Sequence, residues 1–456
     1  MGSGAIISLL VLVVSIPIGI KFVSFFDVPP VPKLEETWWG PGTKGSEDVG
    51  IRPFKITVPD EVISDLNIRL RNTRALVPPL ENAKHSYGIT STLTKNVLDF
   101  WLNKYSWKKR EQFLNQYPQF KTKIQGLDIH FLHVKPKDSK GLKVYPLLLI
   151  HGWPGSVREF YEIIPHLTTP QKGRKVVFEV IAPSIPGYGF SEAAVRPGLG
   201  AVQVAVIFKN LMNRLKLNHY YVQGGDWGSI IANHIATLYP QNVIGLHSNL
   251  CFNDMPIGYL KKAVYSLKPS LIVEKKYEHL VYPMSTIYGN LILESGYMHI
   301  QATKPDTLGT ALSDSPAGLA SYILEKFITW TNPKYKERED GGLTEKYKME
   351  DLLDNIMIYW ITGTITTSMR LYSESFSTAQ TSLQLAKIPV PVPSGCSRFI
   401  HDILYTPTGL LEDKYPKLLH VTDHEAGHFA AFEVPEVLAQ DIYDFSEKVL
   451  SLALNK

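Results

Sequence analysis

The sequence contains little cysteine and no long stretch of charge of one sign. Only Cys251 and Cys396 occur among 456 residues, too few for the disulfide framework of a small secreted domain, so we expect a reducing compartment. The 47 basic and 43 acidic residues leave a net charge of +4, and no basic run is interleaved with aromatic residues. We therefore expect no nucleic-acid partner.

Glycosylation acceptors and internal repeats are also missing. No Asn-x-Ser/Thr triplet occurs anywhere in the chain, which fits a body that does not meet the glycosylation machinery. No repeats or low-complexity tracts interrupt the order of predicted elements. With 456 residues, the chain is long enough for a large core and at least one accessory domain.

The longest apolar run lies at the N-terminus. Residues 4–20 carry no charge, and residues 22–26 extend the run beyond Lys21, whose long side chain can reach the membrane interface. A cleaved signal peptide is the alternative, but no basic residue precedes the run and no A-x-A site follows it. We predict a retained single-pass anchor over residues 1–26. The nearby lysines all follow the span, which favours a cytosolic body.

The most informative motif is the pentapeptide Gly-Gly-Asp-Trp-Gly at 224–228. A predicted strand at 220–222 precedes it and a predicted helix at 229–238 follows it, which is the context of a nucleophile elbow. An ordinary surface turn is the alternative, since Gly and Asp are common turn formers. Asp226 stands where serine is usual, and a carboxylate on such a turn can attack an electrophilic carbon and form an ester. The motif therefore indicates covalent hydrolysis of an epoxide or an alkyl halide.

Two further motifs offer the partners that this nucleophile needs. The bent segment His-Gly-Trp-Pro-Gly at 151–155 follows the apolar strand predicted at 145–150. The backbone N–H of Trp153 is expected to join that of Trp227 in an oxyanion hole. His428 follows a strand-like segment near the C-terminus and comes last in chain order, as the water-activating histidine does in this architecture.

Three carboxylates are candidates for orienting His428. Asp402 lies 26 residues before the histidine, just past a strand predicted to begin near Ile388, and is our choice. Asp423 and Glu425 are nearer in sequence, but they share a connection with the histidine and would have to fold back onto it. They remain alternatives.

Residues 424–428 also match the H-E-x-x-H pattern of zinc peptidases. That pattern needs a continuous helix that places both histidines on one face. Here it follows a predicted strand and contains Gly427, a poor helix former, and no third ligand is evident. We therefore predict neither a metal nor a cofactor.

With these residues assembled, the chain resembles the microsomal epoxide hydrolases, and within them the insect juvenile hormone epoxide hydrolases. The matching segments lie at 38–42, 151–156, 186–191, 224–228, 294–300 and 427–433. The resemblance implies that two tyrosines of a cap domain donate hydrogen bonds to the epoxide oxygen, and the matching positions are Tyr297 and Tyr372. It also implies a location in the endoplasmic reticulum (microsomal) membrane. The family often has glutamate where this chain has Asp402.

The resemblance implies a lipophilic epoxide and water as substrates and a vicinal diol as product. Opening an epoxide creates an alkoxide that a dry pocket cannot solvate, so paired phenols would share its charge. Terpenoid juvenile hormone is the expected substrate, and a broad set of xenobiotic or lipid epoxides is the alternative. A haloalkane dehalogenase and a non-catalytic binder of hydrophobic ligands are the other interpretations.

The order of predicted elements indicates an α/β-hydrolase fold interrupted by a helical cap. No oligomeric state is predicted. The expected segments are a membrane anchor (1–26), a proline-rich linker (27–50), an N-terminal helical collar (51–125), the first half of the α/β core (126–253), the helical cap (254–376) and the second half of the core (377–456).

Overall fold

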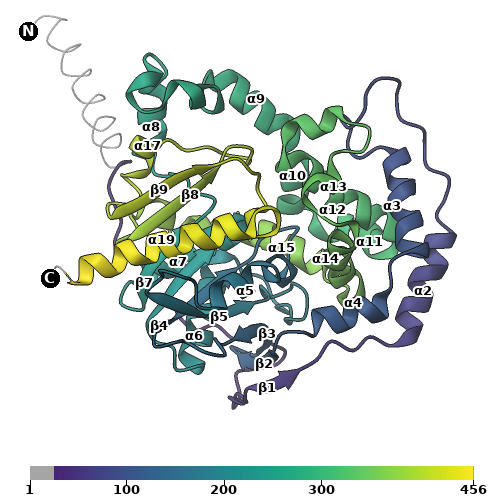
Figure 1. Ribbon diagram of the computed structural model, residues 1–456, viewed down its shortest axis with the longest axis horizontal. Coiled ribbons are helices and arrows are strands. Elements are labelled where there is room, and N and C mark those ends of the chain that lie inside the picture. Colours follow the sequence, from purple (N-terminus) through teal and green to yellow (C-terminus); the bar gives the residue numbers. More distant parts are fainter. Residues whose placement is uncertain (1–24, 455–456) are drawn as a thin grey trace, which may run out of the picture.

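The computed structural model describes residues 25–454, and one nine-stranded sheet lies at its centre (Figure 1). Its strand order is β1-β2-β3-β5-β4-β6-β7-β8-β9. The strands are β1 Arg52–Phe54, β2 Gln119–Ile124, β3 Leu127–Val134, β4 Lys143–Ile150, β5 Val176–Pro183, β6 Tyr220–Gly224, β7 Val243–Ser248, β8 Ser394–Phe399 and β9 Leu418–His424.

The sheet is antiparallel at one end and parallel over the rest. Strands β1, β2 and β3 pair antiparallel with their neighbours, and β3 joins β5 in the same sense. From β5 through β4, β6, β7 and β8 to β9 all pairings are parallel. The parallel strands are largely buried, as strands covered on both faces by helices should be. Their carboxyl ends therefore meet at one edge.

Helices cover both faces of this sheet. The pair α5 and α19 packs on one face, and the pair α6 and α7 packs on the other. The α-helices are α2 Asp60–Arg71, α3 Ser91–Asn103, α4 Trp107–Leu114, α5 Ile163–Thr168, α6 Ala201–Arg214, α7 Asp226–Leu238, α8 Pro256–Tyr265, α9 Met284–Glu294, α10 Gly296–Thr303, α11 Pro305–Asp314, α12 Pro316–Thr331, α13 Leu343–Lys346, α14 Met349–Thr362, α15 Ile365–Ser375, α16 Thr378–Thr381, α17 Thr408–Leu411, α18 Ala430–Glu433 and α19 Pro435–Leu454. This arrangement is the α/β-hydrolase fold, and that prediction is confirmed.

The regular elements between β7 and β8 are all helical. This segment contains α8 to α16 together with short 3-10 turns, and it lies over the carboxyl edge of the parallel strands (Figure 1). The 3-10 turns of the whole described chain are η1 Val157–Phe160, η2 Pro269–Leu271, η3 Lys275–Leu280, η4 Pro333–Glu337 and η5 Leu385–Lys387. The helical insert thus separates the two halves of the core.

Buried charges join the N-terminal helices, the core and the insert. Arg158 of η1 is fully buried and donates from Nε to Oδ2 of Asp354 on α14 at 3.0 Å. Arg110 of α4 donates to Asp351 at 2.7 Å, and Arg158 lies 2.6 Å from the same carboxylate. Buried charges are tolerated where they are paired in this way. The network fixes the insert over the core.

The segment 51–125 differs from the purely helical collar that the sequence predicts. It contains α2, α3 and α4, but also β1 and β2. β1 has only three residues and adds to the sheet by pairing with β2, so only the tertiary structure stabilises it. α2 and α3 pack on α12 of the insert.

Two smaller expectations are also corrected or left open. The strand predicted from Ile388 begins at Ser394, because Pro389, Pro391 and Pro393 lack the N–H groups that a sheet ladder requires.

Residues 1–24 of the predicted anchor lie outside the described residues. Among the helices of residues 25–454, none has the length and apolar composition needed to cross a bilayer.

Two cysteines are too few for a disulfide framework, but Cys251 and Cys396 do form a single disulfide. They are 145 residues apart in sequence, but parallel pairing of β7 with β8 brings their Cα atoms to 6.0 Å, within the usual range for a disulfide. A count of cysteines cannot show such an approach. The inference of a reducing compartment rested on that count and loses its basis.

Candidate active site

Asp226 occupies a tight turn at the carboxyl end of β6. β6 ends at Gly224, and α7 begins at Asp226, whose φ angle is +48°. A positive φ is uncommon outside glycine, and strained backbone of this kind concentrates at functional sites. Gly228 is needed two residues later, in the first turn of α7, because a Cβ atom there would lie 1.9 Å from the carbonyl oxygen of Ile150. The sequence 224–228 thus forms the predicted elbow.

The loop after β4 contacts the Asp226 carboxylate. The backbone N–H of Trp153 donates to Oδ1 of Asp226 at 2.8 Å. Gly152 permits the approach, since a Cβ atom there would lie 2.4 Å from the same oxygen. His151 holds the loop by accepting from the N–H of Ile185 at 3.1 Å, and burial lowers its pKa to about 4. His151 is therefore a neutral structural residue.

His428 lies between two carboxylates. Its Nε2 atom is 3.4 Å from Oδ2 of Asp226, and its Nδ1 atom is 2.6 Å from Oδ1 of Asp402. Burial alone would lower the pKa of His428, but the charges and hydrogen bonds of Asp402 and Asp226 outweigh it and raise the pKa well above its usual value. The histidine is therefore protonated while both carboxylates are charged.

The turn that carries His428 is fixed through its backbone. The N–H of His428 donates to the carbonyl of Trp330 at 2.9 Å. The Glu433 carboxylate accepts from the N–H groups of Gly427 at 2.8 Å and Phe429 at 2.9 Å. Gly427 has no room for a side chain, because a Cβ atom would lie 2.4 Å from the Trp330 carbonyl oxygen. These contacts hold the imidazole toward Asp226.

The rival acids are engaged elsewhere. Asp423 forms a two-bond ion pair with Arg398 at 2.8 and 2.7 Å. The Glu425 side chain is 77% exposed and lies 3.0 Å from His401. Of the three candidate acids, Asp402 is the one that the structure places against His428.

The H-E-x-x-H pattern does not lie on a helix. His424 ends β9 and contacts Asp441 at 2.9 Å, whereas His428 lies in the turn beyond the strand. The two imidazoles therefore face different carboxylates, and the shared helical face that the zinc-peptidase pattern requires does not form.

Two tyrosines from the insert close the site. Tyr297 of α10 stacks on Trp153 with ring centroids 5.4 Å apart, and Tyr372 of α15 meets Trp227 edge-on at 4.8 Å. The centroids of the two tyrosines are 6.0 Å apart. Burial raises the pKa of both phenols well above the usual value, so both remain protonated. The buried Tyr372 hydroxyl has no hydrogen-bond partner of standard geometry among residues 25–454.

Trp227 occupies the first turn of α7, directly after the carboxylate. Its side chain is buried, and its backbone N–H is among those at a helix start that have no partner within the helix. The structure therefore brings together residues from six separate segments of the chain: Trp153, Asp226 with Trp227, Tyr297, Tyr372, Asp402 and His428.

Comparison with known proteins agrees with this geometry. Residues 51–160 match the sequence profile described as "Epoxide hydrolase N terminus", and residues 145–261 match "alpha/beta hydrolase fold". Juvenile hormone epoxide hydrolase 1 of Ctenocephalides felis is 51% identical over 92% of this chain and 90% of its own. The chain belongs to the microsomal epoxide hydrolase family. Epoxide hydrolase 1 of Sus scrofa is 47% identical over 90% of this chain and 92% of its own.

Solved structures show the same relationship. The crystal structure of juvenile hormone epoxide hydrolase from the silkworm Bombyx mori matches this epoxide hydrolase with a TM-score of 0.90 and 50% identity. The match covers 92% of this chain and all of that one. The structure of Aspergillus niger epoxide hydrolase matches with a TM-score of 0.73 and 27% identity, over 93% and 99% of the two chains.

Glu159 is a site residue that the sequence did not reveal. It lines a cavity of about 20 Å³ together with Asp226 and His428, which is room for a single water molecule. Burial, with the nearby charge of Asp226, raises the pKa of Glu159 to about 8 despite the opposing charge of His428. The carboxyl fills the space over Gly155, where a Cβ atom would lie 1.4 Å from Oε1. No spacing or motif marks this residue.

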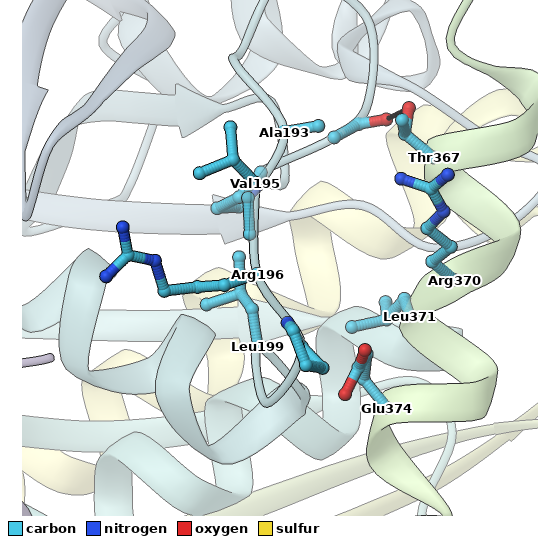
Figure 2. A pocket seen from close by; sticks show the side chains of 12 residues that line it. Ala193, Val195, Arg196, Leu199, Thr367, Arg370, Leu371 and Glu374 are labelled. Carbon is cyan, nitrogen blue, oxygen red and sulfur yellow. Dashed lines mark hydrogen bonds between the residues drawn. The ribbon is translucent and has the colours of Figure 1, made fainter. Parts of the chain in front are cut away.

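A second cavity of about 290 Å³ lies between α15, the helix that carries Tyr372, and the loop 193–199 of this epoxide hydrolase. Figure 2 shows Thr367, Arg370 and Glu374 projecting from α15 toward the loop that carries Leu199. The Glu374 carboxylate accepts from the N–H of Gly198 in that loop at 2.7 Å. None of the predicted catalytic residues lines this cavity. The contact holds α15, and with it Tyr372, against the core.

Proposed function

We propose that this epoxide hydrolase converts juvenile hormone, a lipophilic terpenoid epoxide, to its diol through a covalent ester on Asp226. The observation that carries the mechanism is the position of Asp226, which lies between the Trp153 N–H at 2.8 Å and His428 at 3.4 Å. The names of relatives about half identical to this chain carry the choice of substrate.

The first half-reaction opens the epoxide. Oδ2 of Asp226 attacks an epoxide carbon, the carbon–oxygen bond breaks, and its electron pair goes to the oxygen. Tyr297 and Tyr372 donate hydrogen bonds to the developing alkoxide, and one phenol transfers its proton to it. Their raised pKa keeps both phenols protonated until this step. The result is a hydroxy ester of Asp226 and one tyrosinate.

Ester formation also activates His428. While Asp226 is charged, its carboxylate helps to raise the pKa of the imidazole. The ester is neutral, so this contribution disappears, the pKa of His428 falls, and a proton returns to the tyrosinate through solvent. The neutral imidazole is then a general base, with Asp402 2.6 Å from Nδ1 to stabilise the imidazolium that forms next.

Water cleaves the ester in the second half-reaction. His428 takes one proton from a water in the small cavity beside Glu159, and the hydroxide adds to the ester carbonyl carbon. Oδ1 becomes the oxyanion, which the N–H groups of Trp153 and Trp227 stabilise. Collapse expels the diol oxygen, which takes the proton from His428 and leaves Asp226 as a protonated carboxyl. This carboxyl then gives its proton to the neutral His428, which restores the carboxylate and the imidazolium of the resting site. The protonated carboxyl of Glu159 donates a hydrogen bond that positions the water.

A single turnover in heavy-oxygen water tests the covalent route. Enzyme in excess over a terpenoid epoxide should form a first-turnover diol without label, because the added oxygen comes from Asp226. Label should appear instead in the Asp226 carboxylate, measured by peptide mass spectrometry. Label in the first diol would mean direct attack by water and would refute the ester. Competition between juvenile hormone and a small aromatic epoxide then measures substrate preference.

Membrane anchoring through residues 1–26, with the body on the cytosolic face of the endoplasmic reticulum, is part of the same proposal. The uncharged N-terminal run and the lysines that follow it support the anchor and the orientation. The disulfide is compatible with the cytosol because both cysteines are buried, which limits access of reducing thiols. Protease digestion of intact microsomes should remove the body, and protection of the body would place it in the lumen.

A further inference from the structure

The surface of residues 256–300 is unusually apolar. Ten of the 25 large hydrophobic side chains that are exposed among the described residues lie in this segment. The most exposed are Leu267 at 89%, Leu293 at 81% and Ile292 at 75%. Single exposed hydrophobic residues are ordinary, but a cluster of this size marks an interaction surface. We call this surface the apolar ridge, with Tyr259, Val264, Leu267, Leu271, Ile292 and Leu293 as its members.

The ridge is one continuous feature of the fold. Helix α9 has no buried side chain, although residues 284–293 carry no charge. It lies beside α8, because the Lys262 ammonium sits 5.2 Å from the ring centroid of Tyr288 and the Tyr282 hydroxyl donates to the Lys262 carbonyl at 2.8 Å. Figure 1 shows α8 and α9 along the rim of the molecule, away from the sheet. Apolar side chains on an exposed helix are unfavourable in water, so we expect another apolar surface to cover α9.

We propose that the apolar ridge inserts into the interfacial layer of a lipid bilayer. Its composition matches that of helices that lie in the plane of a membrane surface, with Leu and Ile on the exposed side and aromatic residues beside them. Lys268, Lys275 and Lys276 are exposed in the same segment. Lys275 and Lys276 pair with Glu278 and Glu274, and the Lys268 ammonium suits the anionic headgroups of a cytoplasmic leaflet.

The start of the described chain supports a bilayer as the occupant. The ring of Phe25 lies 5.2 Å from the Lys387 ammonium of η5. Lys414 bridges this region to the base of α8, because it donates to the Ala386 carbonyl at 2.8 Å and lies 3.2 Å from Asp254. The described chain therefore begins on the flank that carries the ridge, and the uncharged run of residues 4–20 comes shortly before this point in the sequence. A membrane that holds the run also meets the ridge.

The ridge also adjoins the reaction site. α9 ends at Glu294 and α10, which carries Tyr297, begins at Gly296. The inference about membrane insertion rests on the proposed function and deepens it. A lipophilic epoxide dissolved in the bilayer reaches the enzyme at the helices that carry the two tyrosines. An inserted ridge delivers substrate from the lipid phase without transit through water.

Lipid quenching of a fluorophore on the ridge tests insertion separately from turnover. Both native cysteines lie in the disulfide, so single substitutions Leu267→Cys and Leu293→Cys in the full chain can be labelled selectively. Matched controls are Ile51→Cys and Val144→Cys, which are exposed at β1 and β4, far from α8 and α9 (Figure 1). The proteins are placed in nanodiscs of phosphatidylcholine and phosphatidylserine with nitroxide-bearing lipid.

Insertion predicts quenching several-fold stronger at 267 and 293 than at 51 and 144. Equal quenching at all four positions would show that the body is only tethered, and would overturn the proposal. Weak quenching at 267 and 293, combined with cross-links between those positions in paired chains, would also overturn it and would assign the ridge to a second copy of the chain.

Turnover of two substrates gives a second test. The double substitution Leu267→Glu with Leu293→Glu should raise the apparent KM several-fold for a terpenoid epoxide dissolved in vesicles. It should leave kcat and KM for a small water-soluble epoxide unchanged, because neither residue lies among the predicted catalytic groups. Equal effects on both substrates would contradict delivery from the bilayer. Absence of all turnover by the unaltered enzyme would refute the proposed function and leave the quenching result standing.

Discussion

The Nδ1 atom of His428 lies 2.6 Å from Oδ1 of Asp402, the acid that the sequence favoured over two rivals without excluding them. Its rivals nearer to the histidine in sequence, Asp423 and Glu425, face Arg398 and His401 instead. Of the three candidates, Asp402 is the one that contacts His428, and this contact leads to the first prediction.

Replacing Asp402 with Asn should slow hydrolysis of the ester on the order of 10⁴-fold, because the imidazole loses the charge and the tautomer that its partner imposes. Epoxide opening should be affected much less, so the hydroxy ester should accumulate and be detected by mass spectrometry. Asp423→Asn is the matched control and should turn over normally. Accumulation of the ester in that control alone would assign the acid to Asp423.

Removing one phenol should impair the first half-reaction. Tyr372→Phe keeps the ring against Trp227 but removes the hydroxyl, and loss of one donor to an oxyanion slows chemistry by about a hundredfold. Stopped-flow measurement of Trp fluorescence should show slower ester formation and an unchanged rate of ester hydrolysis. Tyr322→Phe is a suitable control, since its ring contacts Trp153 at 5.6 Å outside the predicted pair. Slowing of only the hydrolysis step would argue against the proposed role of Tyr372.

Glu159 should make stability depend on pH. Its pKa is about 8 in the folded protein, against 4.5 as the ordinary value, so between these values the folded state holds a proton that the unfolded state has released. Raising the pH across this window therefore favours unfolding. Glu159→Gln stays neutral at every pH and should show a smaller loss of unfolding free energy as the pH rises from about 5.5 to about 8. Urea titrations at both pH values measure the difference, and parallel losses in the two proteins would contradict the raised pKa.

The role of Glu159 in positioning water has its own readout. Glu159→Gln preserves a hydrogen-bond donor and should retain ester hydrolysis, whereas Glu159→Leu removes it and should cause the ester to accumulate. Epoxide opening should be similar in the two variants. Equal ester hydrolysis by the Leu variant and the unaltered enzyme would exclude a positioning role.

The disulfide should contribute to stability because it closes a long loop. Cys251 and Cys396 are 145 residues apart and enclose the helical insert, so the cross-link limits the freedom of the unfolded chain. The double substitution Cys251→Ala with Cys396→Ala should lower the free energy of unfolding by about 2–4 kcal/mol. Reductant should lower the stability of the unaltered protein and leave the double variant unchanged. Identical urea midpoints with and without reductant would contradict the effect.

The sequence by itself determined the parts of this enzyme that depend on local patterns. The elbow at 224–228 and the turn at 151–155 need glycine where chains approach closely, so their composition, read between the predicted strands and helices, indicated both of them. The alternation of strands and helices indicated the α/β-hydrolase fold, and the matching segments indicated the family. Tyr297 and Tyr372 came from the resemblance, because nothing in local spacing distinguishes them among 23 tyrosines.

Only the tertiary structure decided the features that depend on distant residues. The Asp402 contact, the Cys251–Cys396 disulfide and the pairing of β1 with β2 join segments whose separation in sequence carries no pattern. The raised pKa of Glu159 comes from burial beside Asp226, and burial is a property of the packed chain. Exposure of the apolar ridge is likewise invisible in the sequence, where α9 has the composition of any core helix. Hydrophobic pattern shows what a helix can bury, but packing decides whether it does.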